Sequence, residues 1–263
     1  MAERAPLTLP PKLAAIAPDG NLTPRQVRRF LIEMSLRKQK PGTGSAHEFL
    51  RRRTALNPWP DLREILKGMN WVIIGGVATR AYMAERVTKD MDVLVHHTDG
   101  EEVLERLRQA GYTVISHLAV PGYLLRSPDD REIDVLFGKQ KWLKDALSHP
   151  ERDPAGYPVL GFPYLMLMKV TAARPQDWAD VSRMAGVASE EHLTEARAVV
   201  ARYSPRDSDD LEALILLGKR EMEMPKQSEK SAGEASRGAR KKPAGRGNAK
   251  NKPKGKTSRG RKH

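Results

Sequence analysis

Three aspartates stand where carboxylates are unusual, which makes them the first candidates for chemistry. Asp92 and Asp134 each lie inside a short apolar run, Met91–Val95 (MDVLV) and Ile133–Phe137 (IDVLF). Aspartate is disfavoured in strands, and a carboxylate among apolar residues is costly unless it is paired or bound to a metal. Asp90 precedes Asp92 by two residues, so the period of a strand puts both on one face. If the two strands are neighbours, three carboxylates converge on a site suited to Mg²⁺.

A glycine pair supplies a candidate phosphate-binding turn. Gly75 and Gly76 end the strand-like run Trp71–Ile74 and precede residues of helix-forming composition over 77–85. Glycine lets the backbone approach phosphate closely, and a following helix N-terminus offers free N–H groups. An ordinary tight turn would also use such a pair, whereas a dinucleotide fold would need G-x-G-x-x-G spacing, which is absent. Beside a magnesium site, the turn suits phosphoryl or nucleotidyl transfer.

The elements around these residues predict an α+β fold, with a mixed β-sheet flanked by helices and then a helical C-terminal part. We expect a helix capped by Thr98 and Glu101, and a hairpin of 113–119 and 122–127. After Gly138 the pattern is helical to about residue 222. Breaks in that helical part are expected near Pro150–Pro158, Arg174–Pro175, Gly186 and Ser204–Pro205.

The N-terminal region carries helices but no motif that indicates a role. Thr23, Pro24 and Gln26 give a capping box and a helix start. The periodicity predicts one buried apolar stripe on this helix, and its members are Val27, Phe30, Leu31 and Met34. A loose arm over 1–21, a basic helix over 46–56, a turn at Asn57–Pro60 and a short helix ending near Gly68 complete the region.

The positive charge of the chain is concentrated at its end. Residues 226–263 hold 14 Lys and Arg against 2 Glu, which leaves 32 basic and 31 acidic side chains in the preceding residues. Few large apolar residues accompany this charge, so we expect a disordered basic tail. The predicted organisation is an N-terminal arm with helices (1–57), an α/β core (58–138), a helical part that completes the site (139–224) and the tail (225–263).

Composition excludes several classes of protein. The chain has no cysteine, so disulfides, thiolate metal sites and cysteine nucleophiles are excluded. No stretch approaches the ~20 apolar residues of a membrane span, and the N-terminus has no apolar core of signal-peptide length. A cytoplasmic protein without membrane attachment is the expectation.

Taken together, the motifs resemble the nucleotidyltransferase superfamily with the DNA polymerase β-like fold. The resemblance rests on the glycine pair, on Arg86–Val95 (RVTKDMDVLV) and on the lone strand aspartate at 134. Leu167–Val181 (LMKVTAARPQDWADV) is similar to a helix pair of bacterial abortive-infection, toxin-type members. One departure is Gly76, where many relatives place a serine.

The resemblance implies roles for the matching residues. Asp90, Asp92 and Asp134 would be the catalytic metal ligands, with Asp134 placed to help deprotonate the attacking hydroxyl. Gly75 and Gly76 would form the triphosphate-side turn, and Lys169 would reach nucleotide phosphates. Arg174, Asp177 and Asp180 match the later helical motif, in which Arg174 would join Lys169 in binding the nucleotide phosphates. An ion-pair group at a helix start would have the same composition.

The expected function is an Mg²⁺-dependent nucleotidyltransferase that moves an NMP from an NTP to an acceptor hydroxyl. The basic tail would add salt-dependent affinity for RNA, with a tRNA end as one candidate acceptor, but it has no aromatic residue for base stacking. A solubilising tail explains the charge equally well. The alternatives are a non-catalytic nucleic-acid-binding protein with this fold, and a nucleotidyltransferase for a small molecule or a protein. A toxin–antitoxin pair with a cognate antitoxin partner is a further reading.

Overall fold

A computed structural model of the 263-residue chain describes residues 22–38, 59–86, 88 and 90–222. The chain divides into two units, Met1–Pro225 and Lys226–His263, and all of the described residues belong to the first. The expected arm over 1–21, the basic helix over 46–56 and the basic tail lie outside the described residues. Within them, no helix combines the length and the apolar character that a membrane crossing requires.

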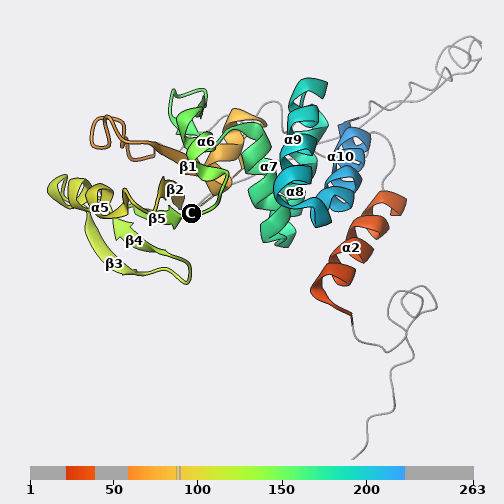
Figure 1. Ribbon diagram of the computed structural model, residues 1–263, viewed down its shortest axis with the longest axis horizontal. Coiled ribbons are helices and arrows are strands. Elements are labelled where there is room, and N and C mark those ends of the chain that lie inside the picture. Colours follow the sequence, from red (N-terminus) through yellow and green to blue (C-terminus); the bar gives the residue numbers. More distant parts are fainter. Residues whose placement is uncertain (1–21, 39–58, 87, 89, 223–263) are drawn as a thin grey trace, which may run out of the picture. The chain divides into compact units, whose positions relative to one another are not determined.

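The core of the fold is a mixed sheet, which confirms the predicted α+β class (Figure 1). The sheet is seven-stranded, in the order β3-β4-β5-β2-β1-β7-β6. The strands are β1 (Trp71–Ile74), β2 (Met91–His96), β3 (Thr113–His117), β4 (Gly122–Arg126), β5 (Glu132–Gly138), β6 (Glu151–Arg152) and β7 (Pro158–Val159). β2 pairs antiparallel with β1 and parallel with β5, so it lies between the strand that leads to the glycine pair and the strand that carries Asp134.

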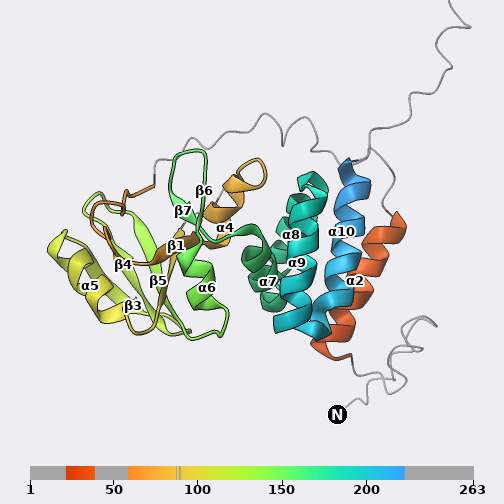
Figure 2. The same cartoon turned by 45° about the horizontal axis from the view of Figure 1, so that its top comes forward.

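Short and long helices follow the strands. In the α/β part they are α4 (Gly75–Ala78), the 3₁₀ helix η1 (Thr79–Ala81), α5 (Gly100–Gln109) and α6 (Leu143–Ser148). Elsewhere they are α2 (Pro24–Lys38), α7 (Phe162–Ala172), α8 (Pro175–Val187), α9 (Glu190–Tyr203), η2 (Pro205–Asp207) and α10 (Ser208–Met222). Figures 1 and 2 show α8, α10 and α2 side by side, and α5 beside the strands.

Several local predictions are confirmed. The 113–119/122–127 hairpin appears as β3 and β4. The capping box of α2 is reciprocal, because Thr23 N donates to Gln26 Oε1 at 2.8 Å and Gln26 N donates to Thr23 Oγ1 at 3.3 Å. Helix α8 begins at Pro175, as the Arg174–Pro175 break predicted.

Other local predictions are wrong. Helix α5 begins after Asp99 and no side chain caps it, so the Thr98/Glu101 box does not form. Residues 63–68 form turns in place of a helix. The 139–160 region is not all helical, because β6 and β7 add to the sheet through a parallel contact between β7 and β1.

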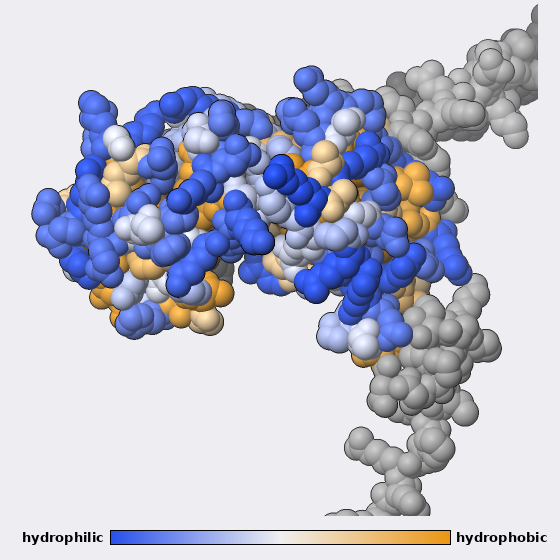
Figure 3. Space-filling model, viewed as in Figure 1, coloured by the Kyte–Doolittle hydropathy of each residue, from blue (hydrophilic) through white to orange (hydrophobic). Residues whose placement is uncertain are grey.

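The buried face of α2 also differs from the predicted stripe. Val27 and Leu31 are 37% and 43% exposed, while Arg28 and Ile32 are buried. The Arg28 guanidinium lies 2.7 Å from a carboxylate oxygen of Asp207 and 2.7 Å from one of Asp210. These ion pairs turn the helix so that an arginine faces inward. On the face drawn in Figure 3, hydrophilic residues dominate and apolar ones form small scattered groups.

Candidate active site

The sheet meets the condition under which the sequence analysis expected the strand aspartates to converge. β2 and β5 are parallel neighbours, and Asp92 is the register partner of Asp134. Adjacent strands lie about 4.8 Å apart, so the two carboxylates start from neighbouring backbone positions. Asp90 comes directly before β2, where its side chain is exposed and accepts a hydrogen bond from Thr88 Oγ1 at 3.3 Å.

The glycine pair lies against this aspartate group because β1 is the other neighbour of β2. Ile74 is the register partner of Asp92, which places Gly75 immediately beyond it. Gly75 has a φ of +67°, and a Cβ added there would lie 1.8 Å from Asp92 Oδ2. A side chain at position 75 would therefore strain the backbone and displace the Asp92 carboxylate.

The charges of this group are unbalanced. The pKa of Asp92 is raised to about 6, by burial first and then by the neighbouring Asp90 and Asp134 carboxylates, against the smaller opposing effects of Arg174 and Lys169. Burial, with Asp90 and Glu132, also raises the pKa of Asp134. The folded chain thus concentrates negative charge at the three aspartates beside the glycine turn. A cation bound there would relieve the repulsion between their carboxylates.

The donor set fits a hard cation such as Mg²⁺, which prefers carboxylate oxygen and water. Among the described residues, no three acidic or histidine side chains are close enough together to form a ready-made metal site. Asp90 is exposed, and exposed side chains change rotamer in picoseconds to nanoseconds without backbone movement. The fit therefore rests on the oxygen-only chemistry and on the charge of the carboxylates.

A second charged group, the α7–α8 network, lies in the helical part. It consists of Arg86, Lys169, Arg174, Asp177 and Asp180. Lys169 Nζ is buried and lies 2.7 Å from Asp180 Oδ2 and 3.4 Å from Asp177 Oδ1. The pKa of Asp180 is raised by burial but lowered more by Lys169 and Arg86, so it lies below its usual value. Three cations thus surround two buried carboxylates, so these carboxylates are neutralised within the chain, unlike the strand aspartates.

The two cations predicted to meet phosphate differ in accessibility. Lys169 is buried and bound to the chain's own carboxylates. The Arg174 side chain is 73% exposed, and its Nε donates to Asp177 Oδ2 at 2.7 Å. Both cations act on Asp92, so both lie near the strand aspartates, and Arg174 is the one that solvent reaches.

Sequence reasoning did not assign a role to Arg86 in this arrangement. Its guanidinium binds Asp180 on α8 and also lies where a side chain at Gly76 would be. The signal was present, because Arg86 opens the RVTKDMDVLV segment that carries the family resemblance. The segment could not indicate that Arg86 pairs with Asp180, which lies 94 residues further along the chain.

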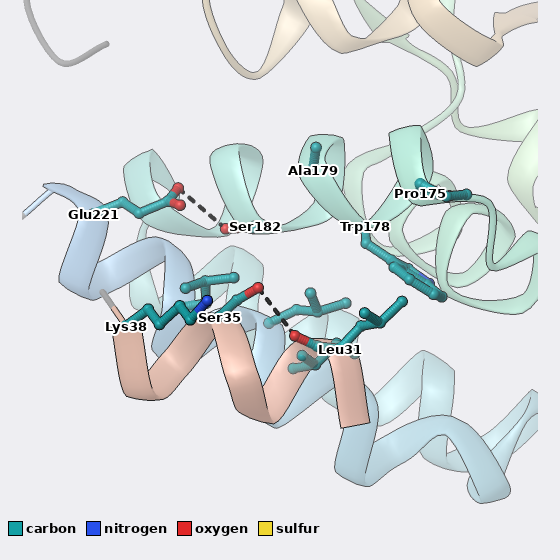
Figure 4. A pocket seen from close by; sticks show the side chains of 11 residues that line it. Leu31, Ser35, Lys38, Pro175, Trp178, Ala179, Ser182 and Glu221 are labelled. Atoms are coloured by element: carbon teal, nitrogen blue, oxygen red, sulfur yellow. Dashed lines mark hydrogen bonds between the residues drawn. The ribbon is translucent and has the colours of Figure 1, made fainter. Parts of the chain in front are cut away.

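A groove lies on the opposite face of α8 (Figure 4). At 100° per residue, Pro175, Trp178 and Ser182 share one face of the helix, and Asp177 and Asp180 share the other. The groove has a volume of about 410 Å³ and is completed by Leu31, Ser35 and Lys38 of α2 and by residues of α10 that include Glu221. Helix α8 therefore separates the groove from the charged network.

Comparison with known proteins gives matches among solved structures only. No protein-family model and no curated protein matches the chain. A crystal structure of ANT(2″)-Ia with adenylyl-2″-tobramycin is 17% identical, over 57% of this chain and 88% of that one, with a TM-score of 0.33. The lincomycin-bound lincosamide antibiotic adenylyltransferase LnuA is 15% identical, over 53% and 90%, with a TM-score of 0.32.

A third similar structure is a uridylyl transferase. Terminal uridylyl transferase 4 from Trypanosoma brucei, with bound GTP, is 14% identical over 71% of this chain and 58% of that one, with a TM-score of 0.24. The similar solved structures are nucleotidyltransferases.

Proposed function

We propose that the chain is an Mg²⁺-dependent nucleotidyltransferase that moves an NMP from an NTP to a hydroxyl of an acceptor, with RNA as the preferred acceptor. One observation carries the proposal. Asp92 and Asp134 face each other across parallel strands, Asp90 precedes them, and a positive-φ glycine packs directly on Asp92. This combination places carboxylate ligands for a cation beside a glycine turn whose backbone is open to phosphate.

Each part of the site has a role in that reaction. Asp90, Asp92 and Asp134 would hold the magnesium, which when bound neutralises phosphate charge and favours the ionised acceptor oxygen. The Gly75–Gly76 turn would receive the triphosphate on its backbone. Exposed Arg174 would contact phosphate oxygens, and Lys169 would add positive potential from behind Asp177 and Asp180.

The transfer conserves atoms and charge in one displacement. The acceptor oxygen forms a bond to the α-phosphorus of the triphosphate as its proton passes to Asp134. The bond from that phosphorus to the bridging oxygen breaks, and pyrophosphate leaves with the electron pair.

The acceptor follows from the charge of residues 226–263, where 14 basic side chains meet 2 acidic ones. Such a segment gives affinity for any polyanion, and the affinity falls with salt. We assign RNA, which is such a polyanion and carries a free hydroxyl at its 3′ end, with the end of a tRNA as one candidate acceptor. A toxin role with a cognate antitoxin is part of the same proposal.

A transfer assay tests the proposal. Purified protein, Mg²⁺, each α-labelled NTP and total RNA are combined beside Asp90→Ala and Asp92→Ala variants. We expect label in RNA only with both aspartates present. RNA binding without transfer would favour the non-catalytic nucleic-acid-binding alternative. Transfer to an aminoglycoside or a protein would keep the chemistry and replace the acceptor.

A further inference from the structure

The absence of a side chain at Gly76 leaves room for two side chains from the segment before β2. A Cβ at position 76 would lie 2.9 Å from Arg86 Nη2 and 2.9 Å from Thr88 Oγ1. Thr88 Oγ1 also lies 3.3 Å from Asp90 Oδ1. The turn that we assign to the triphosphate is therefore packed against the residues that lead to the strand aspartates.

The same arginine reaches helix α8. Arg86 Nε donates to Asp180 Oδ1 at 2.9 Å, and Nη2 donates to Oδ2 at 3.1 Å. The Asp180 side chain has no exposed surface. It also accepts hydrogen bonds from Lys169 Nζ at 2.7 Å and from Gln176 Nε2 at 3.1 Å. Asp180 is thus a fixed anchor, and a two-point contact to it fixes the plane of the guanidinium.

We propose that Arg86 is a positioning residue that fixes the Gly75–Gly76 turn relative to the start of helix α8, and thereby sets the affinity for the triphosphate. This inference rests on the proposed function for its kinetic consequence. The turn and Arg174 would bind the same triphosphate from two elements far apart in sequence. Arg86 contacts the first element and, through Asp180, the second. It touches no reacting atom itself.

A lysine cannot replace this contact. It keeps the charge but offers one ammonium in place of the planar, two-point guanidinium. Arg86→Lys should therefore loosen the turn while leaving Asp180 paired with a cation. Misplacement of a binding group by about 1 Å costs up to roughly 100-fold in rate, so we expect the KM for the triphosphate to rise about 10- to 100-fold.

The chain contains a matched control. Arg197 Nε and Nη2 donate to the two carboxylate oxygens of Glu212 at 2.6 and 3.1 Å, the same two-point arrangement, between α9 and α10. Arg197→Lys removes a two-point contact that is more exposed than that of Arg86 and does not involve the turn. A variant that only lowers the folded fraction lowers apparent kcat and leaves both KM values unchanged, which separates positioning from general stability.

The experiment has two arms on the full-length protein. In the first, hydrogen–deuterium exchange is followed over 75–81 without nucleotide, and we expect faster exchange in Arg86→Lys but not in Arg197→Lys. In the second, KM is measured for the triphosphate and for the acceptor, and only the triphosphate KM should rise in Arg86→Lys. Unchanged exchange in the first arm overturns the inference, whether or not the protein transfers nucleotides.

A failure of the proposed function is visible separately. Wild-type protein without transfer contradicts that function, and the exchange arm still decides whether Arg86 fixes the turn. An active wild type with equal triphosphate KM values in Arg86→Lys and Arg197→Lys also overturns the inference.

Discussion

Asp92 and Asp180 are aspartates near the same site, and their surroundings have opposite effects. Asp92 faces two other carboxylates, and its pKa is raised to about 6. Asp180 is more deeply buried, yet Lys169 and Arg86 hold its pKa below the usual value. Burial raises both pKa values; the nearby charges decide the outcome.

The comparison assigns Asp92 to a binding site and Asp180 to the structural framework around it. A carboxylate group in mutual repulsion costs stability that only an added cation recovers, which is the usual signature of a functional position. A carboxylate matched by buried cations has its partners already within the chain. The charges around a buried aspartate therefore indicate whether it serves to bind a cation or to stabilise the fold. The predictions below test this distinction.

The largest expected effect is on activity at Asp92. Asp92→Asn removes a predicted metal ligand, so transfer should fall at least about 1000-fold. The metal-free variant should also be more stable than wild type by about 1–2 kcal/mol at pH 7.5, because the charge repulsion is gone. Rate assays and urea unfolding measure the two quantities. A variant that loses activity and stability together would show that Asp92 is structural.

The same substitution at Asp180 should have the opposite effect on stability. Asp180→Asn leaves Lys169 and Arg86 without their shared carboxylate, which should cost about 3 kcal/mol. Because the folded pKa of Asp180 is depressed, its contribution to stability is present above the ordinary pKa of 3.8 and is lost as pH falls through the folded pKa. Urea unfolding from pH 7 to pH 3 follows this loss. Equal stability of Asp180→Asn and wild type at pH 7 would show that the ion pairs of Asp180 with Lys169 and Arg86 do not stabilise the fold.

Magnesium should stabilise the protein without any reaction. At about 100 times its dissociation constant, a ligand adds roughly 2.7 kcal/mol. The pKa of Asp92 is about 6, above its ordinary 3.8, so its repulsive cost is full above pH 6 and disappears as pH falls towards 4. The Tm increase with Mg²⁺ should thus be larger at pH 7.5 than at pH 5.5. It should be much smaller in Asp92→Asn, and an equal increase there would place the cation elsewhere.

The smallest effect is expected at Arg174, whose side chain is mostly exposed. Arg174→Ala should raise the KM for the triphosphate about tenfold, which corresponds to ~1.4 kcal/mol. Its effect on Tm should be small, because a mostly exposed ion pair contributes little. Steady-state kinetics and a thermal melt suffice. No change in KM would remove Arg174 from the triphosphate site.

The sequence by itself determined the elements that local patterns encode. The apolar runs at Trp71–Ile74 and around Asp92 and Asp134 became β1, β2 and β5, because strand composition and flanking glycines are local signals. The strand period predicted Asp90 and Asp92 on one face, and the MDVLV and IDVLF runs predicted two strands. The sheet then made those strands parallel neighbours in matching register. The roles of these residues in catalysis remain predictions.

Only the tertiary structure decided which charges meet. The apolar stripe of α2 was predicted from periodicity, but ion pairs of Arg28 with Asp207 and Asp210 turned another face inward. Lys169 became buried on Asp180, and Arg86 joined the glycine turn to α8. β7 was missed because so short a strand is defined by its hydrogen-bonding partner β1, not by its own residues. Periodicity records which face of an element is apolar, whereas an ion pair depends on a partner that the fold brings from far along the chain.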